Sequence, residues 1–519
     1  MSAAVKRHRI VHFASELAPL VKVGGLADVV GALSSEQARR GHQVVVALPA
    51  FGTVTLPPGW SREPLGSSEV AWGMGHEPAV FELLVPDSSD GSSAGSLRVL
   101  LVGHEGSRRF FDRSGIYDDP ATGEGYPDNG ERFLFFTRAA LEGLKLLGGP
   151  YDVLHAHDHQ AGWVPCLVRT HEAAELAFAD AATIFTVHNL GYQGIHDPFV
   201  LGLAGFGREL FYATGPFEFW GRVNYMKVGL SFADMISTVS PRYAQEIQSG
   251  GEYGFGLEGL LQRRSGDLWG ILNGIDDTYW DPRRDAHLPY PFDRRNPAGK
   301  RANRTALLTE CGFPTKPDWP IVGMISRLAD QKGFDLIEQA EQDLVRLETR
   351  FVVLGSGQTR YQDLLARLAM RYPQRWFYRQ GFDEAFAHRI EAGCDLFLMP
   401  SRYEPCGLNQ MYSLRYGTVP VVRATGGLAD TVQDFDPASR RGNGFQFHRY
   451  DPADMVNALR RGFTVYRQPH LWSQLRDNGM ACDFSWRRSA DGYDRLYAEA
   501  LQRVRSGRVP TLDSVRAEA

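Results

Sequence analysis

The chain has 519 residues, of which 43% are hydrophobic and 23% charged, and its formal net charge is -5. Because domains usually hold roughly 100–200 residues, this length indicates two large domains or three small ones. The composition is that of an ordinary globular protein and excludes the disordered, collagen-like and disulfide-rich classes. The net negative charge gives no general attraction to nucleic acid, so a phosphate-bearing ligand needs a local cluster of Lys and Arg.

The cysteines and the N-terminal region indicate a reducing compartment. Five cysteines are widely spaced and form no Cys-x-x-Cys pair, which argues against a disulfide framework and against a zinc site. The segment from Met1 to Arg9 is short and basic, and no apolar signal segment follows it. No apolar run approaches the roughly 18 residues of a membrane span. We therefore expect a soluble cytoplasmic protein with neither a membrane nor a nucleic-acid partner.

Short apolar segments alternate with helical stretches along the first half, which is typical of an α/β protein with parallel strands. Helices are predicted over residues 27–40, 130–147 and 162–171. The expected strands are Ile10–Ala14, Gln43–Leu48, Leu97–Val102, Asp152–Ala156, Thr183–Val187, Met235–Val239 and Gly270–Leu272.

The same alternation restarts in the second half. The expected strands are Ile321–Ile325, Phe351–Leu354, Trp376–Tyr378, Leu396–Met399 and Val419–Val422. Helices are predicted over Arg301–Glu310, Leu336–Thr349, Tyr361–Tyr372, Glu384–Ala392 and Leu408–Tyr416. Two successive series indicate two Rossmann-like domains, in which ligands bind beyond the carboxyl ends of the strands. Two such domains facing each other would place the site in the cleft between them.

Two segments interrupt these series. Residues 281–320 are rich in Pro, Arg and Asn and are the expected connection between the domains. Residues 60–96 hold many Gly, Ser and Pro, and within them Asp87–Ser96 is predicted to be a loop.

A glycine turn follows the first predicted strand. Lys22-Val23-Gly24-Gly25-Leu26 opens a helical stretch, and glycines there allow backbone amides to approach an anion. The helix N-terminus and Lys22 add favourable charge. The motif is neither a Walker A loop nor the dinucleotide pattern. A tight turn with a surface lysine is the equally weighted alternative.

Two strands end in histidines. His155-Ala156-His157-Asp158-His159 closes one strand, and Thr186-Val187-His188-Asn189 closes another. Alternate strand residues share a face, so His155, His157 and His159 could converge on a metal ion. The chain supplies no obvious further ligand cluster, so we favour binding of sugar hydroxyls, or structural hydrogen bonds, over a metal.

Basic residues follow the first strand of the second series. Arg327 and Lys332 lie in Ser326-Arg327-Leu328 and Gln331-Lys332-Gly333, just after Ile321–Ile325. Two fixed cations at a strand end suit a diphosphate leaving group and can replace a divalent metal. The alternative is a solvated basic turn.

A carboxylate and a glycine turn follow Leu396–Met399. In Pro400-Ser401-Arg402-Tyr403-Glu404-Pro405-Cys406-Gly407-Leu408, the amides of Cys406, Gly407 and Leu408 would face a phosphate at a helix N-terminus. Glu404 could bind sugar hydroxyls or stabilise positive charge at an anomeric carbon. Gly427 belongs to a further glycine turn at the next strand end. Asp434-Phe435-Asp436 has the letters of a metal motif, but no strand precedes it, so we interpret it as a loop.

Taken together and in order, these motifs resemble the glycogen and starch synthase family over about residues 9–500. The resemblance rests on the glycine turn at Lys22, the histidine motifs, Leu272-Asn273-Gly274, the basic motif at Arg327 and the segment around Glu404. It implies an α/β GT-B fold, with two Rossmann-like domains facing each other across a deep cleft. The implied domains are residues 1–265, which bind the glucan, and 266–482, which bind the donor. A C-terminal helix over residues 483–505 crosses back to the first domain.

The resemblance also implies the reaction and the roles of the site residues. Glucose passes from ADP-glucose to the non-reducing end of an α-1,4-glucan, such as glycogen, with retention and without a cofactor or an essential metal. It implies that Lys22, Gly24 and Gly25 lie near the diphosphate and the acceptor. It also implies that Asp158 and His188 contact the sugars and that Asn273 lies at the hinge side of the cleft. Arg327 and Lys332 hold the diphosphate, Glu404 is the principal catalytic carboxylate, and the amides of Gly407 and Leu408 contact the donor.

Three positions bear on how closely the chain follows the family. His159 stands where the family usually has Trp, and Phe382 stands where related enzymes use Tyr beside the base. Tyr412 occupies the position of a second Glu in many related enzymes, as is usual in this family. UDP-glucose remains an alternative donor, and an α-glucan phosphorylase or a non-catalytic glucan-binding scaffold are weaker alternatives. The phosphorylase would need a pyridoxal-phosphate lysine, for which the sequence shows no signature.

Overall fold

A computed structural model describes residues 7–86 and 95–518, so most of the predicted loop Asp87–Ser96 lies outside the described residues. The chain divides into two compact units. The first comprises the described residues up to Val239, then Ala244–Ile271 and the segment from Trp486 onward. The second comprises Ser240–Tyr243 and Leu272–Ser485.

The first unit is built on a nine-stranded sheet of order β12-β11-β7-β6-β1-β2-β5-β4-β3. The seven strands from β12 to β5 are parallel. Their central runs are buried apolar residues, as expected for parallel strands covered on both faces. These strands are β1 (Arg9–Phe13), β2 (Gln43–Pro49), β5 (Ser96–His104), β6 (Val153–His157), β7 (Ala182–Val187), β11 (Met235–Thr238) and β12 (Leu268–Gly270).

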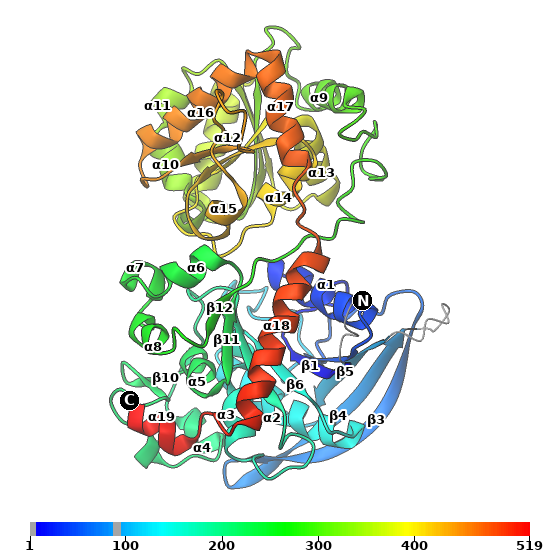
Figure 1. The fold of residues 1–519 in the computed structure, drawn as a ribbon, viewed down its shortest axis with the longest axis vertical. Helices are drawn as coiled ribbons and strands as arrows, with labels where there is room; N and C mark the ends of the chain where they lie inside the picture. Colours follow the sequence, from blue (N-terminus) through cyan, green and yellow to red (C-terminus); the bar gives the residue numbers. More distant parts are fainter. Residues whose placement is uncertain (1–6, 87–94, 519) are drawn as a thin grey trace. The chain divides into compact units, whose positions relative to one another are not determined.

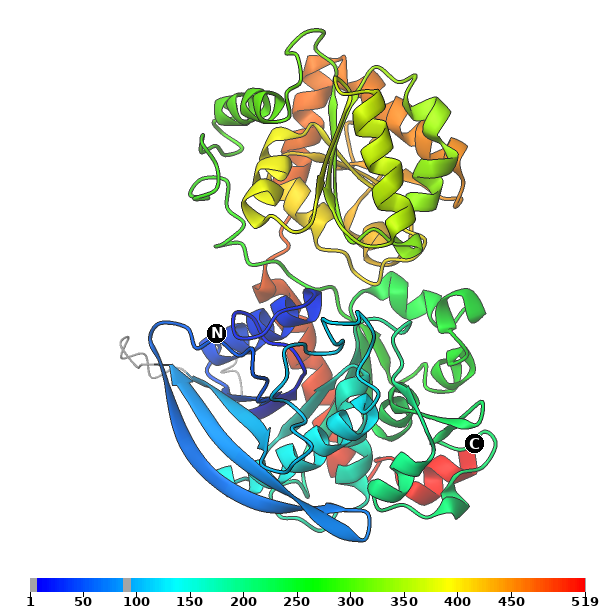
Figure 2. The same ribbon diagram turned by 180° about the vertical axis from the view of Figure 1, so that it is seen from behind.

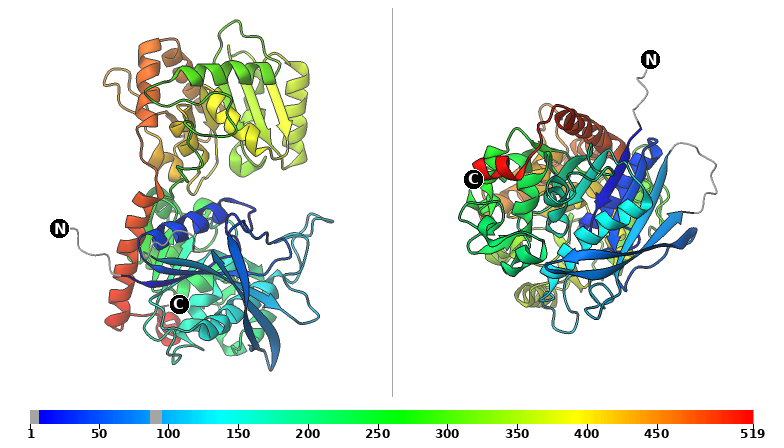
Figure 3. Two further views of the ribbon diagram at one scale, coloured as in Figure 1. Left: turned by 90° about the vertical axis from the view of Figure 1, so that its right-hand side faces the viewer. Right: turned by 90° about the horizontal axis from the view of Figure 1, so that it is seen from below.

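A long antiparallel hairpin extends this sheet. Strands β3 (Trp60–Trp72) and β4 (Gly75–Pro86) pair along their length, with a register shift between Pro64 and Gly66. They form the curved edge of the unit in Figures 2 and 3. No strand is predicted here from the sequence, because Gly and Pro disfavour strands and β3 is largely exposed. The alternation that would reveal a half-buried strand is therefore weak in β3.

Helices cover the parallel part of the sheet. The larger ones are α1 (Gly25–Arg39) and α2 (Asn129–Leu147), both predicted from the sequence to within two residues at their starts. The shorter helices of this unit are α3 (Trp163–Arg169), α4 (Phe199–Leu203), α5 (Tyr225–Phe232), α7 (Gly251–Gly254), α8 (Glu258–Arg263) and α19 (Leu512–Glu518). Helix α6 (Pro241–Glu246) begins in the short segment that belongs to the second unit and ends in the first. A small sheet joins β8 (Ile195–His196), β10 (Arg222–Asn224) and β9 (Glu218–Phe219).

The C-terminal helix α18 (Trp486–Arg505) belongs to this first unit, and Figure 1 shows it running beside α1 and β6. Its apolar face, with Tyr493, Leu496 and Tyr497, is buried in one cluster with residues of α1, β1, β6 and β7. Arg40 also donates a hydrogen bond to Asp494 at 2.6 Å. The unit extends to Ile271 because β12 pairs with β11, so residues 266–271 lie here and not in the second unit.

The second unit holds a six-stranded parallel sheet of order β15-β14-β13-β16-β17-β18. Figure 3 shows helices on both of its faces. The strands are β13 (Ile321–Ile325), β14 (Arg350–Gly355), β15 (Trp376–Gln380), β16 (Leu396–Met399), β17 (Val419–Arg423) and β18 (Phe445–Phe447). The helices are α9 (Ala298–Glu310), α10 (Phe334–Gln339), α11 (Glu341–Leu344), α12 (Thr359–Arg371), α13 (Glu384–Gly393), α14 (Asn409–Arg415), α15 (Gly426–Thr431), α16 (Pro452–Tyr466) and α17 (Pro469–Met480).

One predicted helix of this unit is divided. The stretch Leu336–Thr349 forms α10 and α11, which meet at Ala340. All five predicted strands of the second half are present. None of the helices in the described part of the chain combines the length and the hydropathy that a membrane crossing requires.

Candidate active site

In the first unit, a buried carboxylate shapes the turn between β1 and α1. Glu16 Oε2 accepts hydrogen bonds from the backbone N–H groups of Val23 and Gly24, both at 2.7 Å. Its other oxygen accepts a hydrogen bond from the Tyr117 hydroxyl at 2.8 Å. The amides of Val23 and Gly24 thus bind a carboxylate of the chain itself and hold the turn together, whereas the sequence predicted that amides of this turn would face the anion of a ligand.

The predicted binding residues of this turn lie at the start of α1. Gly24 precedes the helix and Gly25 is its first residue. A Cβ atom added to Gly24 would have no atom within 4 Å, so the space beside this residue is open. Lys22 is half-exposed, and its Nζ donates to Asp28 Oδ1 at 2.8 Å. An anion at this helix start would compete with Asp28 for the lysine.

Asp158 occupies a strained position at the end of β6. Its φ of 54° and ψ of -177° fall in a region that essentially only glycine adopts. Such a conformation costs on the order of 1–3 kcal/mol and is concentrated at functional sites. The side chain is held there by bonds to the next strand end, where Asp158 Oδ1 accepts the His188 backbone N–H at 2.7 Å.

The surroundings of Asp158 also shift its ionisation. Burial raises the pKa of Asp158 to about 7, opposed by hydrogen bonds from the backbone of His188 and Asn189, while the nearby Glu16 carboxylate raises it further. At neutral pH this carboxyl group can therefore either donate or accept a hydrogen bond. Asp158, His188, Glu16 and Tyr117 together form a polar cluster at the carboxyl ends of β1, β6 and β7.

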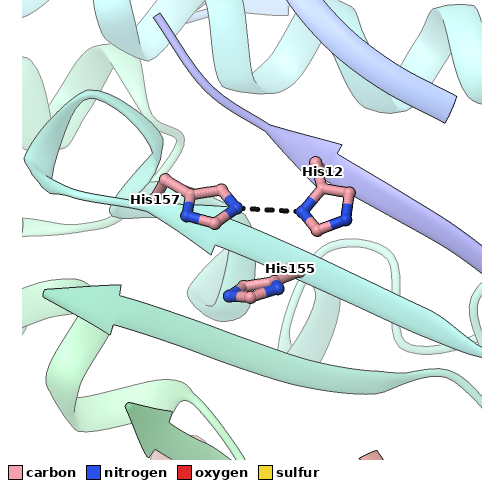
Figure 4. Close-up of side chains that lie close together, drawn as sticks. All are labelled: His12, His155 and His157. Atoms are coloured by element: carbon pink, nitrogen blue, oxygen red, sulfur yellow. Dashed lines mark hydrogen bonds between the residues drawn. The ribbon is translucent and has the colours of Figure 1, made fainter. Parts of the chain in front are cut away.

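The predicted convergence of three histidines is partly wrong. His155 and His157 share a face of β6, where they lie beside His12 of β1 (Figure 4). His159 lies in the short helical turn that follows, and its Nδ1 bonds the Tyr192 carbonyl at 3.1 Å. The alternation of a strand ends at His157, so His159 no longer shares its face.

His12, His155 and His157 are fully buried, and one nitrogen from each lies within 4.8 Å of the others. A metal ion fits this trio poorly. Each of the six ring nitrogens already bonds a protein group. The rings of His155 and His157 are stacked, with centroids 4.2 Å apart and planes 28° from parallel. Since nitrogen lone pairs lie in the ring planes, stacked rings do not aim them at one point.

In the second unit, Lys332 and Glu404 form an ion pair. Lys332 Nζ lies 2.6 Å and 2.9 Å from the two carboxylate oxygens of Glu404, and Ser401 Oγ donates to the same carboxylate at 2.9 Å. Glu404 is only 5% exposed. Lys332 follows β13 and Glu404 follows β16, and these neighbouring parallel strands bring the two residues to one edge of the sheet.

Glycines permit the close backbone approach that this arrangement needs. A Cβ atom at Gly333, where φ is 76°, would lie 2.0 Å from the Pro400 carbonyl oxygen. A Cβ atom at Gly426 would lie 1.9 Å from the Glu404 carbonyl oxygen, and one at Gly427 would lie 2.2 Å from the Cys406 carbonyl oxygen. The predicted glycine turn at Gly427 therefore supports the backbone of the Glu404 segment directly.

The residues after Glu404 lead into α14. Leu408 is the N-cap residue of this helix, and Gly407 has a φ of 71°. Cys406 is buried, which raises the pKa of its thiol to about 12, so the thiol stays neutral. Hydrogen bonds from Asn273 to Cys406 oppose that rise. Asn273 is thereby placed beside the same segment as Glu404.

The two remaining predicted residues are exposed. Arg327 follows β13, as Lys332 does, on the surface of the second unit. Phe382, beyond the end of β15, is 85% exposed, which is unusual for a large aromatic residue and leaves its ring available for stacking. The Asp434 and Asp436 carboxylates bond nearby backbone amides and Arg461, in agreement with the loop interpretation of this segment.

Glu16, Tyr117 and Ser401 belong to these clusters, but their roles are not predicted from the sequence. Glu16 stands only three residues after β1, between that strand and the glycine turn, and that position is a usable signal. Tyr117 comes from a loop between β5 and α2 with no recognisable pattern. Only the folded structure brings its hydroxyl to Glu16 and to Ser15.

Comparison with known proteins defines the class of protein. Residues 9–263 match the family model of the starch synthase catalytic domain, and residues 313–473 match that of the group 1 glycosyl transferases. A solved structure, the catalytic domain of starch synthase IV from Arabidopsis thaliana bound to ADP and acarbose, is 34% identical with a TM-score of 0.85. It covers 96% of this chain and 100% of its own. The chain is a glycosyltransferase, and the predicted two-domain α/β GT-B class is confirmed.

Curated relatives identify the family. A glycogen synthase of Koribacter versatilis is 45% identical over 501 residues, covering 95% of this chain and 98% of its own length. One of Anaeromyxobacter dehalogenans (strain 2CP-C) is 47% identical over 489 residues, covering 94% and 99%. The chain belongs to the glycogen and starch synthase family. A sucrose-phosphate synthase from Thermosynechococcus elongatus, 18% identical with a TM-score of 0.57, shares the fold alone.

Proposed function

We propose that this enzyme transfers glucose from ADP-glucose to the non-reducing end of an α-1,4-glucan, with retention of configuration. The observation that carries the proposal is the Lys332–Glu404 ion pair at the carboxyl edge of the second sheet. It pairs a cation suited to a diphosphate with a carboxylate suited to a sugar, in a chain of the glycogen synthase family. ADP and acarbose bound to the Arabidopsis relative support a nucleotide and a glucan as ligands.

The second unit binds the donor in this proposal. As the sugar–phosphate bond breaks, negative charge grows on the diphosphate, and Lys332 and Arg327 stabilise it. The amides of Gly407 and Leu408 contact the donor, and Phe382 stacks on the base. These cations do the work that a divalent metal does in other sugar-nucleotide enzymes, so the reaction needs no metal and no cofactor.

Glu404 stabilises the sugar. Positive charge develops on the glucose ring in the transition state, and a nearby carboxylate lowers the energy of that charge. In the unliganded protein Lys332 neutralises Glu404. A bound diphosphate draws the lysine toward itself, which frees carboxylate charge for the ring. Retention without a separate nucleophile is then achieved by attack on the face that the diphosphate leaves, with the leaving phosphate accepting the hydroxyl proton.

The first unit binds the glucan. Asp158 and His188 lie in contact at adjacent strand ends and offer a carboxyl and an imidazole group to sugar hydroxyls. Lys22, Gly24 and Gly25 contribute at the start of α1. The backbone strain at Asp158 supports a functional role, because glycine would remove that strain at a position where no side chain is needed.

Nucleotide release with glycogen as acceptor tests this proposal. ADP-glucose and UDP-glucose are compared at equal concentration, with and without a chelator. We expect faster release of ADP than of UDP, at a rate that the chelator leaves unchanged. Preference for UDP-glucose would overturn the donor, and loss of activity with chelator would overturn the roles of Arg327 and Lys332. No release with either donor, with glycogen still bound, would favour a glucan-binding scaffold.

A further inference from the structure

A continuous chain of hydrogen bonds connects His188 to the interior of the first unit. His188 Nε2 lies 2.9 Å from His157 Nδ1. His157 Nε2 lies 2.9 Å from His12 Nδ1, the bond drawn in Figure 4. His12 Nε2 lies 2.7 Å from Gln37 Oε1, on α1. Three imidazoles in series therefore separate the candidate sugar site from a glutamine of α1.

These imidazoles are neutral. Burial lowers the pKa of His12 to about 4 and that of His188 to about 3, and the pKa of His157 lies well below its usual value for the same reason. A neutral imidazole has one donor nitrogen and one acceptor nitrogen. When neutral imidazoles are bonded in series, each must therefore donate in the same direction along the chain. Fixing the donor at one end fixes the tautomer of every ring.

Gln37 supplies that fixed end. Its Oε1 can only accept, so His12 donates through Nε2 and accepts through Nδ1. His157 then donates from Nε2 and accepts at Nδ1, and His188 donates from Nε2. The acceptor of His188 is left at Nδ1, which makes no hydrogen bond to any residue that the structure describes.

The amide nitrogen of Gln37 has a hydrogen-bond partner on the C-terminal helix. Gln37 Nε2 donates to the Tyr497 hydroxyl of α18 at 2.9 Å. That hydroxyl lies 2.8 Å from His155 Nδ1, and His155 Nε2 lies 2.5 Å from Thr186 Oγ1. The C-terminal helix is thereby connected, through one amide group, to the candidate sugar site.

We propose that Gln37 is a positioning residue that sets the tautomer of His188, so that His188 Nδ1 accepts a hydrogen bond from a hydroxyl of the bound sugar. The sugar contact of His188 rests on the function proposed above. The tautomer does not, because it follows from bonds inside the first unit. Gln37 acts through His12 and His157 and touches no substrate.

The tautomer can be measured directly in the unliganded enzyme. In protein labelled with ¹⁵N-histidine, long-range proton–nitrogen correlation spectra distinguish protonated from unprotonated ring nitrogens, and the spectrum of His188→Asn assigns the signals of His188. We expect His188 to carry its proton on Nε2 in wild type. A proton on Nδ1 in wild type would overturn the proposal, as would stoichiometric bound metal in elemental analysis of the purified protein.

Gln37→Met tests the origin of the tautomer. Methionine has a similar shape but neither a donor nor an acceptor comparable to the amide. The three imidazoles can then donate in either direction, and the His188 signals should shift toward a mixture of the two tautomers. With about half of the population in the tautomer that cannot accept, we expect kcat/KM for ADP-glucose and glycogen to fall about twofold. An unchanged His188 spectrum would overturn the role of Gln37.

Thr186→Val is the matched control, and Tyr497→Phe is a second route. Thr186→Val removes a buried bond to His155 but leaves the chain from Gln37 to His188 intact, so it should lower stability while the His188 tautomer and kcat/KM stay as in wild type. Tyr497→Phe releases the Gln37 amide and should shift the tautomer even if Gln37→Met fails to fold. A shifted tautomer with unchanged kcat/KM would instead overturn the sugar contact of His188 and leave the role of Gln37 standing.

Discussion

Lys332 and Glu404 lie 72 residues apart in the sequence, yet Lys332 Nζ contacts both oxygens of the Glu404 carboxylate, at 2.6 and 2.9 Å. The pair is largely withdrawn from water, since the two side chains are 22% and 7% exposed. A charge buried in this way is tolerated only while it is paired. The two residues therefore depend on each other for stability.

The first prediction concerns that mutual dependence. Lys332→Met leaves an unpaired buried carboxylate and should lower the free energy of unfolding by about 2–4 kcal/mol. Lys332→Met combined with Glu404→Gln should recover part of that loss, because no buried charge remains unpaired. Urea unfolding of both single variants and of the double variant measures the coupling. Strictly additive losses would contradict a direct ion pair.

The second prediction concerns turnover. If Lys332 stabilises the leaving diphosphate as one oxyanion-hole donor does, Lys332→Ala should lower kcat by about 10²–10³. Arg460→Ala is the control, because Arg460 is an exposed residue of α16 whose side chain bonds only Asn457 in the described part of the chain. ADP release with saturating glycogen gives kcat for each variant. Near-normal turnover in Lys332→Ala would remove the lysine from the reaction.

The third prediction concerns backbone packing behind Glu404. Gly426→Ala places a Cβ atom 1.9 Å from the Glu404 carbonyl oxygen, so the segment must move, and both stability and kcat should fall. Gly312→Ala is the matched control, because Gly312 also has a positive φ, 69°, but open space around its Cβ position. It should cost only about 1 kcal/mol of backbone strain. Equal losses in the two variants would argue against the contact with Glu404.

The fourth prediction concerns pH. Burial holds the pKa values of His12 and His196 at about 4 and those of His159 and His188 at about 3, and it also lowers those of His155 and His157. Between these values and 6.5 the unfolded chain binds more protons than the folded chain, so stability rises with pH, by at most about 1.4 kcal/mol per unit for each histidine.

Two carboxyl groups act in the opposite direction. Burial raises the pKa of Asp158 to about 7 and that of Glu391 to about 8. Each group therefore makes the folded protein less stable as the pH rises above the pKa that the group has in the unfolded chain. The histidines outnumber them, and we expect the free energy of unfolding, measured in urea, to increase from pH 5 to pH 6.5. A flat or falling profile over this interval would show that the buried histidines are not held neutral.

The parallel strands were the most predictable part of the fold. Runs such as Ile321–Ile325 and Leu396–Met399 are apolar throughout because both faces of the sheet are covered, and the structure reproduces both ranges. The hairpin of β3 and β4 was not predicted, because its pairing is antiparallel and β3 is mostly exposed, so its sequence carries weak periodicity. The division of Leu336–Thr349 into α10 and α11 is likewise not predicted by any sequence pattern.

The site was predictable where residues follow strand ends. Lys332, Glu404, Asp158 and His188 all lie in the segments that follow predicted strands, and the parallel topology alone brings each pair to one sheet edge. The hydrogen-bond partners of such residues are harder to predict from the sequence. Glu16 holding the glycine turn, and Gln37 bonded to His12, depend on tertiary contacts that no local pattern encodes. His159 was misplaced because strand alternation was extended past the end of β6.

The most direct test of the central claim is the product of the reaction. ADP-glucose labelled with ¹³C in the glucose is incubated with a short maltooligosaccharide, and the new linkage is read by NMR. We expect one added glucose, joined by an α-1,4 bond at the non-reducing end, with release of one ADP. A β linkage, addition at another position, or hydrolysis to free glucose without chain extension would contradict it.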